Sequence, residues 1–161
     1  DKTPYNWVAL PRILEVFPQA QFIHLVRDGR DCAVSIVDAK IAGDLPTAAR
    51  RWVQAVAACR RFSAGLGERR FLEVKYEDLV QSPDATLRQV CGFLEIAFTP
   101  KMLDFHEDAD ELGDSILPHH GNLRRPLFSS SIGKWHRRLS EEEQRRVMDI
   151  VSEALAELRY I

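Results

Sequence analysis

The run AQFIHLV at residues 20–26 is short, largely apolar and rich in bulky side chains. Such a run is typical of a strand buried inside a sheet. In residues 4–17, apolar side chains recur at three- and four-residue spacing, which indicates a helix. Pro11 is expected in the first turn of this helix or at a break, and Pro18 is expected to end it. The sequence therefore opens with a predicted helix followed by a predicted strand.

The rest of the chain continues this alternation. FLEVKY, residues 71–76, predicts a second strand with alternate side chains on one face. Apolar periodicity, N-cap residues and the capping box SEEE predict helices over residues 32–42, 46–65 and 82–94, a short one from Thr99, and a last one from Ser140. Strands that alternate with helices predict an α/β fold, a parallel β-sheet flanked by helices.

Two further features concern domain organisation. Residues 107–131 are polar, carry glycines and prolines and lack periodicity, which predicts a long loop of a kind that is often functional. No repeat or linker divides the sequence. We therefore expect a single domain over residues 1–161, a length sufficient for one hydrophobic core.

Composition narrows the functional classes. The formal net charge of -2 argues against a nucleic-acid binder, because such proteins carry clustered Lys and Arg. Cys32, Cys59 and Cys91 are widely spaced, which favours buried thiols over a disulfide framework or a zinc site. The lack of such a framework favours a cytoplasmic location. No apolar run approaches the ~20 residues of a membrane span, and the sequence shows no signal peptide.

The charged turn RDGRD, residues 27–31, stands between the first strand and the following helix. In parallel sheets, ligands bind outside the carboxyl ends of strands, where helix N-termini present free N–H groups to anions. Arg27 can form two parallel hydrogen bonds to a phosphate, and Ser35 can add a hydroxyl from the next turn. The turn favours phosphate binding, and a salt-bridged strand-to-helix connection without a ligand is the alternative.

The remaining residues of the turn have expected structural roles. Gly29 permits backbone conformations that a Cβ atom forbids. Asp28 and Asp31 are expected to cap the helix or to hold Arg30.

The segment FIHLVRDGRDCAVS, residues 22–35, resembles the 3'-phosphate-binding strand, loop and helix of sulfotransferases that use 3'-phosphoadenylyl sulfate (PAPS). Three more segments resemble this family in the same order, at residues 1–22, 71–94 and 125–140. The likeness is greater to the tyrosylprotein and bacterial branch than to the cytosolic branch, whose covering loop carries an Arg-Lys-Gly that is not found before Trp135. The resemblance implies the three-layer, P-loop-like sulfotransferase fold and in-line transfer of a sulfuryl group from PAPS to an acceptor hydroxyl or amine, without a metal.

The resemblance also assigns site residues. It implies that Arg27 and Ser35 hold the 3'-phosphate of the cosubstrate and that Tyr76 lies near the nucleotide. Arg125 and Lys134 match a loop that covers it, whose Trp135 we interpret as a packing anchor. Lys2 matches a lysine that reaches the transferring sulfonate, where a fixed ammonium stabilises charge on the equatorial and leaving oxygens.

Parts of the family pattern are missing. The N-terminal phosphate loop and the upstream glutamate base of the tyrosylprotein branch have no match, and the base histidine of the cytosolic branch would fall at Pro4. These departures imply the C-terminal part of a sulfotransferase, and a chain starting at Asp1 is expected to be inactive alone.

The sequence leaves other interpretations open. A nucleotide kinase of related phosphate-loop architecture and a non-catalytic domain that keeps the fold to bind a partner are the alternative functions. Lys2, Arg125 and Lys134 are then solvated cations, and Tyr76 is a core tyrosine bonded to a backbone group. His24, inside the first strand, is interpreted as a hydrogen-bonded core histidine. The acceptor and the oligomeric state are left open by the sequence.

Overall fold

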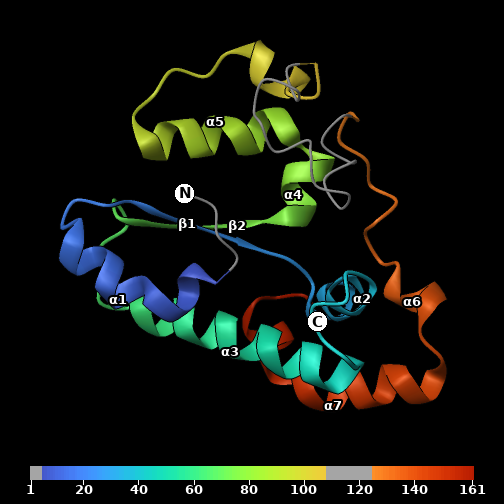
Figure 1. The fold of residues 1–161 in the computed structure, drawn as a ribbon. Coiled ribbons are helices and arrows are strands. Elements are labelled where there is room, and N and C mark those ends of the chain that lie inside the picture. Colours follow the sequence, from blue (N-terminus) through green and yellow to red (C-terminus); the bar gives the residue numbers. More distant parts are fainter. Residues whose placement is uncertain (1–4, 108–124) are drawn as a thin grey trace. The chain divides into compact units, whose positions relative to one another are not determined.

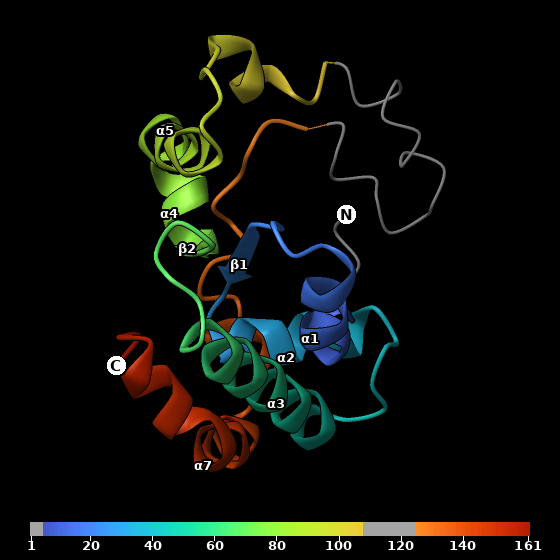
Figure 2. The same ribbon diagram turned by 90° about the vertical axis from the view of Figure 1, so that its left-hand side faces the viewer.

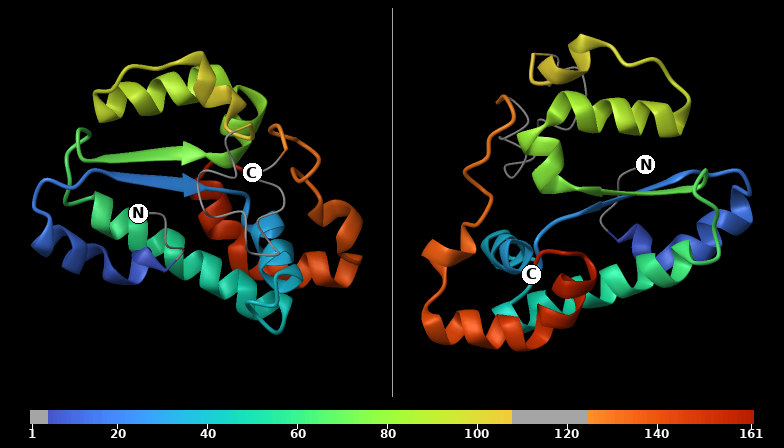
Figure 3. Two further views of the ribbon diagram at one scale, coloured as in Figure 1. Left: turned by 45° about the horizontal axis from the view of Figure 1, so that its top comes forward. Right: turned by 180° about the vertical axis from the view of Figure 1, so that it is seen from behind.

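The computed structural model describes residues 5–107 and 125–161 of the 161-residue chain. Its two strands, β1 (Phe22–Val26) and β2 (Phe71–Lys75), form a two-stranded sheet and run in the same direction (Figure 3). The helices, labelled in Figure 1, are α1 (Asn6–Val16), α2 (Gly29–Asp38), α3 (Leu45–Ser63), α4 (Tyr76–Gln81), α5 (Pro83–Leu94), the 3-10 helix η1 (Pro100–Asp104), α6 (Trp135–Arg138) and α7 (Glu141–Glu157). The predicted α/β class, a parallel sheet flanked by helices, is confirmed.

The predicted elements are present, with changes at their ends. α2 begins at Gly29, before the predicted start, because the Asp28 side chain caps it by accepting the N–H of Arg30. α1 contains Pro11 in its interior rather than in its first turn. The Ser140 capping box is confirmed: its Oγ accepts the Glu143 N–H at 3.3 Å, and the Glu143 carboxylate accepts the Ser140 N–H at 2.8 Å.

Two short helices were not predicted. α4 begins at Tyr76, so this residue starts a helix rather than ending β2. α6 is a single turn that begins at Trp135, inside the segment that resembles a covering loop.

The described chain divides into two compact units, Asp1–Glu73 with Gly133–Ile161, and Val74–Ile132. In the first unit, α3 contacts α1, α2 and α7 (Figure 2). The buried residues between these helices include Ala33, Val34, Trp52, Val151 and Leu155. This core fixes the start of α2 against the middle of α3. The expectation of one domain over residues 1–161 stays a prediction.

The second unit contains α4, α5 and η1. α5 contacts both α4 and η1, and the sulfur atoms of Cys91 and Met102 lie 3.7 Å apart in this packing. Cys59 and Cys91 are buried free thiols, as the sequence indicated, whereas the free thiol of Cys32 is only partly buried. Across the residues that the structure describes, no helix combines the length and the apolar character that crossing a membrane requires.

Candidate functional site

The charged turn lies where β1 ends, at the carboxyl end of the strand. Asp28 is the N-cap of α2 and also holds the guanidinium of Arg30, with Nη2 to Oδ2 at 2.6 Å and Nε to Oδ1 at 3.0 Å. Arg30 in turn lies over the ring of Trp135, with its Cζ 4.2 Å from the ring centroid. Asp28 and Arg30 therefore shape the turn, as predicted.

Gly29 is required for a reason other than the predicted one. The left-handed region is occupied by one described glycine, Gly133, and not by Gly29. A Cβ atom on Gly29 would lie 2.6 Å from the ring of Trp52, which is too close for any side chain. The same indole donates a hydrogen bond from Nε1 to the carbonyl oxygen of Arg27 at 3.1 Å. Gly29 thus allows α3 to approach the turn and to fix the backbone at Arg27.

Asp31 neither caps α2, whose N-cap is Asp28, nor holds Arg30, so both of its predicted roles were wrong. Its side chain is fully buried, and its carboxylate accepts two backbone hydrogen bonds, from the N–H of Gly133 at 2.7 Å and of Trp135 at 3.0 Å. Nη2 of Arg27 lies 3.8 Å from the Oδ2 that accepts the Gly133 N–H. The start of α2 is therefore tied to a segment about a hundred residues further along the chain.

One face of α2 gathers three of the predicted site residues. Ser35 follows Asp31 by four residues, which places these two on the same face of α2, and Arg27 precedes the helix with its Nη2 3.8 Å from Oδ2 of Asp31. Lys134 reaches the far end of that face, with its Nζ 3.6 Å from Oδ2 of Asp38. The side chains of Arg27 and Lys134 remain 17% and 20% exposed, so both cations are accessible to solvent.

Asp38 is shared by two cations. Arg138 in α6 donates from Nη2 to Oδ1 of Asp38 at 2.7 Å, while Lys134 approaches the other oxygen. The carboxylate is 38% exposed, so solvent screens both ion pairs. Lys134 is thus held by a weak, exchangeable contact.

Tyr76 and Arg125 belong to the second unit. The hydroxyl of Tyr76 lies 2.8 Å from Oγ of Ser131, so it contacts a side chain of the segment that resembles the covering loop. Arg125 is exposed. Lys2 falls outside the described residues, and its predicted role stays a prediction.

Two residues near the site have structural roles that the sequence indicated. Trp135 is buried in the core of the first unit, which agrees with its interpretation as an anchor. Nδ1 of His24 lies 3.1 Å from Oε2 of Glu73. Burial lowers the pKa of His24, but hydrogen bonds to Cys59 and Glu73 outweigh it and raise this pKa from 6.5 to about 9. His24 is hydrogen-bonded, as predicted, but it is only partly buried and lies outside the hydrophobic core, because its neighbours Ile23 and Leu25 in β1 are exposed.

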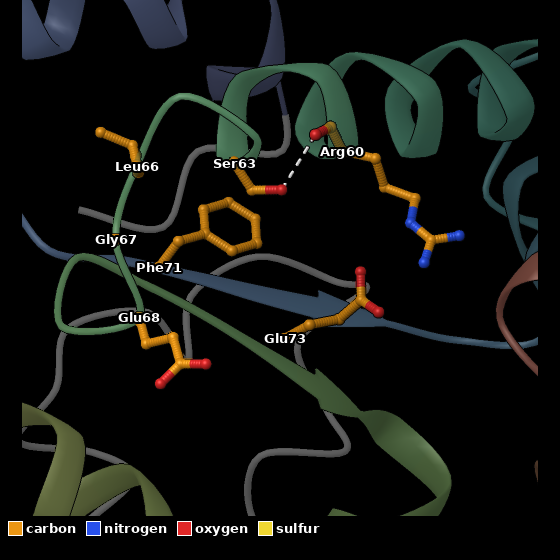
Figure 4. Close-up of a pocket in the computed structure, with 7 residues that line it drawn as sticks. All are labelled: Arg60, Ser63, Leu66, Gly67, Glu68, Phe71 and Glu73. Carbon is orange, nitrogen blue, oxygen red and sulfur yellow. Dashed lines mark hydrogen bonds between the residues drawn. The ribbon is translucent and has the colours of Figure 1, made fainter.

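Two pockets open on the first unit. One, of about 280 Å³, lies between the end of α3, the following loop and the start of β2 (Figure 4). Its lining residues, from Arg60 to Glu73, include none of the charged turn, so this pocket is separate from the candidate site. The other, of about 420 Å³, borders the turn and is lined by Arg30, Trp135, Glu141, Gln144, Arg145, Met148 and Asp149.

Comparison with known proteins identifies the family to which this chain belongs. The model of the sulfotransferase family matches residues 1–100. The chain is therefore a member of the sulfotransferase family. The resemblance found in the sequence motifs is confirmed at this level.

Individual relatives agree with this family assignment. The chain is 27% identical to protein-tyrosine sulfotransferase A of Caenorhabditis elegans, over 99% of this chain and 44% of that protein, and 26% identical to nodulation protein NoeE of Sinorhizobium fredii, again over 99% and 44%. Among solved structures, it matches the sulfotransferase domain of the Synechococcus PCC 7002 olefin synthase with a TM-score of 0.78 at 25% identity, over 95% of this chain and 56% of that one. The chain spans less than two thirds of the length of each of these relatives.

Proposed function

We propose that the chain is part of a sulfotransferase that transfers a sulfuryl group from PAPS to an acceptor hydroxyl or amine. The observation that carries this proposal is the set of polar side chains along one face of α2. Arg27 and Lys134 lie at its two ends as partly accessible cations, with Ser35 between them. Family membership supports the reaction class, and the site supports an anionic cosubstrate.

The residues present fit a phosphate group. A guanidinium presents two parallel N–H donors and a hydroxyl adds a third, which match the oxygens of a phosphate. Because the chain has a formal net charge of -2, attraction of an anion depends on this local cluster. We assign the 3'-phosphate of PAPS to Arg27 and Ser35, and a further contact with the nucleotide to Lys134.

The remaining site residues take the roles that the family resemblance implies. We assign Tyr76 and Arg125 to contacts with the nucleotide, and Lys2 to the charge that develops on the oxygens of the transferring group. PAPS supplies an activated sulfuryl group when it is bound. Each fixed charge contact of this kind contributes about 2 to 4 kcal/mol to lowering the barrier, as the loss of single donors from oxyanion holes indicates.

The acceptor is proposed at the level of chemical class. Two of the relatives are named as protein-tyrosine sulfotransferases, from C. elegans and Drosophila melanogaster, which makes a phenolic hydroxyl the first acceptor to test. A cytoplasmic location remains a prediction from the cysteine pattern.

The experiment that tests the proposal is a binding measurement on the full-length protein. Titration calorimetry with adenosine 3',5'-bisphosphate is expected to show one site without added magnesium. A tenfold excess of ATP is expected to leave that binding unchanged. Displacement by ATP with a magnesium requirement would favour the nucleotide kinase instead, and no binding of either nucleotide would favour the non-catalytic domain.

A further inference from the structure

We propose that Asp31 is a positioning residue of this site: its buried carboxylate ties the segment that carries Lys134 to the turn that carries Arg27. The inference rests on the proposed function, because Arg27 and Lys134 are its nucleotide-binding residues. Asp31 itself is enclosed by protein and is expected to act through these two cations.

The side chain of Asp31 is fully buried. A carboxylate with no exposed surface is costly to keep in a protein unless charge-assisted hydrogen bonds replace its hydration. Two backbone N–H groups do this, those of Gly133 at 2.7 Å and Trp135 at 3.0 Å, one on each oxygen. These two hydrogen bonds therefore define the position of the Gly133 and Trp135 backbone relative to the Asp31 carboxylate.

The backbone at Gly133 and Lys134 has a conformation that suits this contact with Asp31. Gly133 has φ +69°, in the left-handed region, and Lys134 follows with φ -61° and ψ -25° in the right-handed helical region. A left-handed residue next to a right-handed one turns alternate N–H groups toward one point, which forms a nest for an anion. Here that anion is the carboxylate of Asp31. The nest is filled by the protein itself, so the loop is left to contact a ligand through the side chain of Lys134.

Arg27 also lies close to the Asp31 carboxylate. Its Nη2 lies 3.8 Å from the same Oδ2 that accepts the Gly133 N–H. At this distance the contact is electrostatic rather than a short hydrogen bond. A single carboxylate oxygen thus faces both the arginine of the turn and the backbone beside Lys134, and it links Arg27 to the backbone segment that carries Lys134.

A purely structural role for Asp31 makes a different prediction. If the carboxylate only stabilises the core, its loss lowers stability, and Lys134 contributes the same binding energy as before in the molecules that fold. If it positions the loop, the contribution of Lys134 disappears with it. A double-mutant cycle separates these two cases, since it measures the coupling between residues.

The test uses the full-length protein and four variants, with the Kd for adenosine 3',5'-bisphosphate as the readout. Asp31→Asn keeps the size of the side chain, but its amide group cannot accept the second N–H. Lys134→Ala is expected to weaken binding about tenfold in the wild-type background and less than twofold in the Asp31→Asn background. Asp31→Asn alone is expected to weaken binding at least tenfold. Asp84→Asn is the matched control, because Asp84 also lies in the first turn of a helix but is exposed.

Two outcomes overturn the inference in distinguishable ways. If the wild type does not bind the nucleotide, the proposed function fails and this inference fails with it. If the wild type binds and Lys134→Ala costs the same in both backgrounds, the inference alone fails. Should Asp31→Asn not fold, Gly133→Ala takes its place in the cycle. A Cβ atom there meets only an ordinary contact at 3.8 Å, so this change strains the left-handed backbone of the nest without a clash.

Discussion

The indole nitrogen of Trp52 donates a hydrogen bond to the carbonyl oxygen of Arg27, at 3.1 Å. This contact joins the middle of α3 to the residue that leads into α2. The ring of Trp52 also covers Gly29, where no side chain would fit. α3 therefore determines where the charged turn lies, and the position of the Arg27 backbone depends on a helix that contributes no predicted ligand.

The close approach of Trp52 and Gly29 predicts a cost for adding one methyl group. Gly29→Ala places a Cβ atom 2.6 Å from the ring and is expected to lower the free energy of unfolding by about 1 to 3 kcal/mol, as overpacking does. Urea denaturation measures this change. Gly43→Ala is the control, because a Cβ atom there has no neighbour within 4 Å. Equal stability of the two variants would contradict the account of Gly29.

Removal of the ion pair between Lys134 and Asp38 is expected to increase the affinity for adenosine 3',5'-bisphosphate. If Lys134 leaves Asp38 to contact the nucleotide, Asp38→Asn removes a competing interaction of about 0.2 to 1 kcal/mol, the usual size for an exposed pair. The Kd for adenosine 3',5'-bisphosphate is then expected to fall by up to about fivefold. Glu15→Gln, which removes a more exposed carboxylate from its pair with Arg12, is expected to change nothing. Weaker binding by Asp38→Asn would show that Lys134 needs Asp38 to hold it.

His24 predicts a pH dependence of stability. Its pKa in the folded protein is about 9, above the ordinary value of 6.5, because hydrogen bonds to Cys59 and Glu73 outweigh burial. A raised folded-state pKa stabilises the fold fully below pH 6.5, and this contribution is lost as the pH rises through about 9. The loss amounts to at most about 3 kcal/mol. Urea unfolding at pH 6 and pH 9 measures it.

The variant His24→Gln provides the comparison for this pH dependence. It cannot bind a proton in this range, so its stability is expected to change less between pH 6 and pH 9 than that of the wild type. Identical changes in the two proteins would assign the pH dependence to other groups.

Loss of the capping box of α7 is expected to lower the free energy of unfolding by less than the deprotonation of His24 does. Ser140→Ala removes the hydroxyl that accepts the Glu143 N–H and is expected to lower the free energy of unfolding by about 1 kcal/mol. Thermal unfolding followed by circular dichroism checks this. Ser152 is in the interior of the same helix, so Ser152→Ala is expected to cause no such loss. A larger loss for Ser152→Ala than for Ser140→Ala would contradict the capping account.

The sequence predicted the long elements because each carries a complete periodic pattern. Helices such as α3 and α7 show apolar stripes over several turns, β1 is a short apolar run, and β2 shows alternating side chains. α4 was missed because its six residues follow β2 without a break, so that Tyr76 continues the alternation of the strand. α6 was missed because a single turn is too short to show a period.

The candidate site was predictable to a different degree. Family resemblance proposed Arg27, Ser35 and Lys134 from ordered motifs, and the fold gathers these residues along α2. The partner of Asp31 was not predictable in the same way, since local spacing suggested Arg30 while the actual partners are two backbone amides far along the chain. The need for glycine at position 29 could not be predicted from the sequence either, because it depends on the nearby ring of Trp52 rather than on the conformation of the turn.

The most direct test of the account is the affinity of Arg27→Ala for adenosine 3',5'-bisphosphate in the full-length protein. Loss of a charge-assisted contact to phosphate costs about 1.5 to 3 kcal/mol, so the Kd is expected to rise at least tenfold. Arg12→Ala is the matched control, because Arg12 is an exposed arginine on α1 that pairs with Glu15. A rise confined to Arg27→Ala is the predicted result. Equal affinity of the two variants would contradict the assignment of Arg27 to the phosphate.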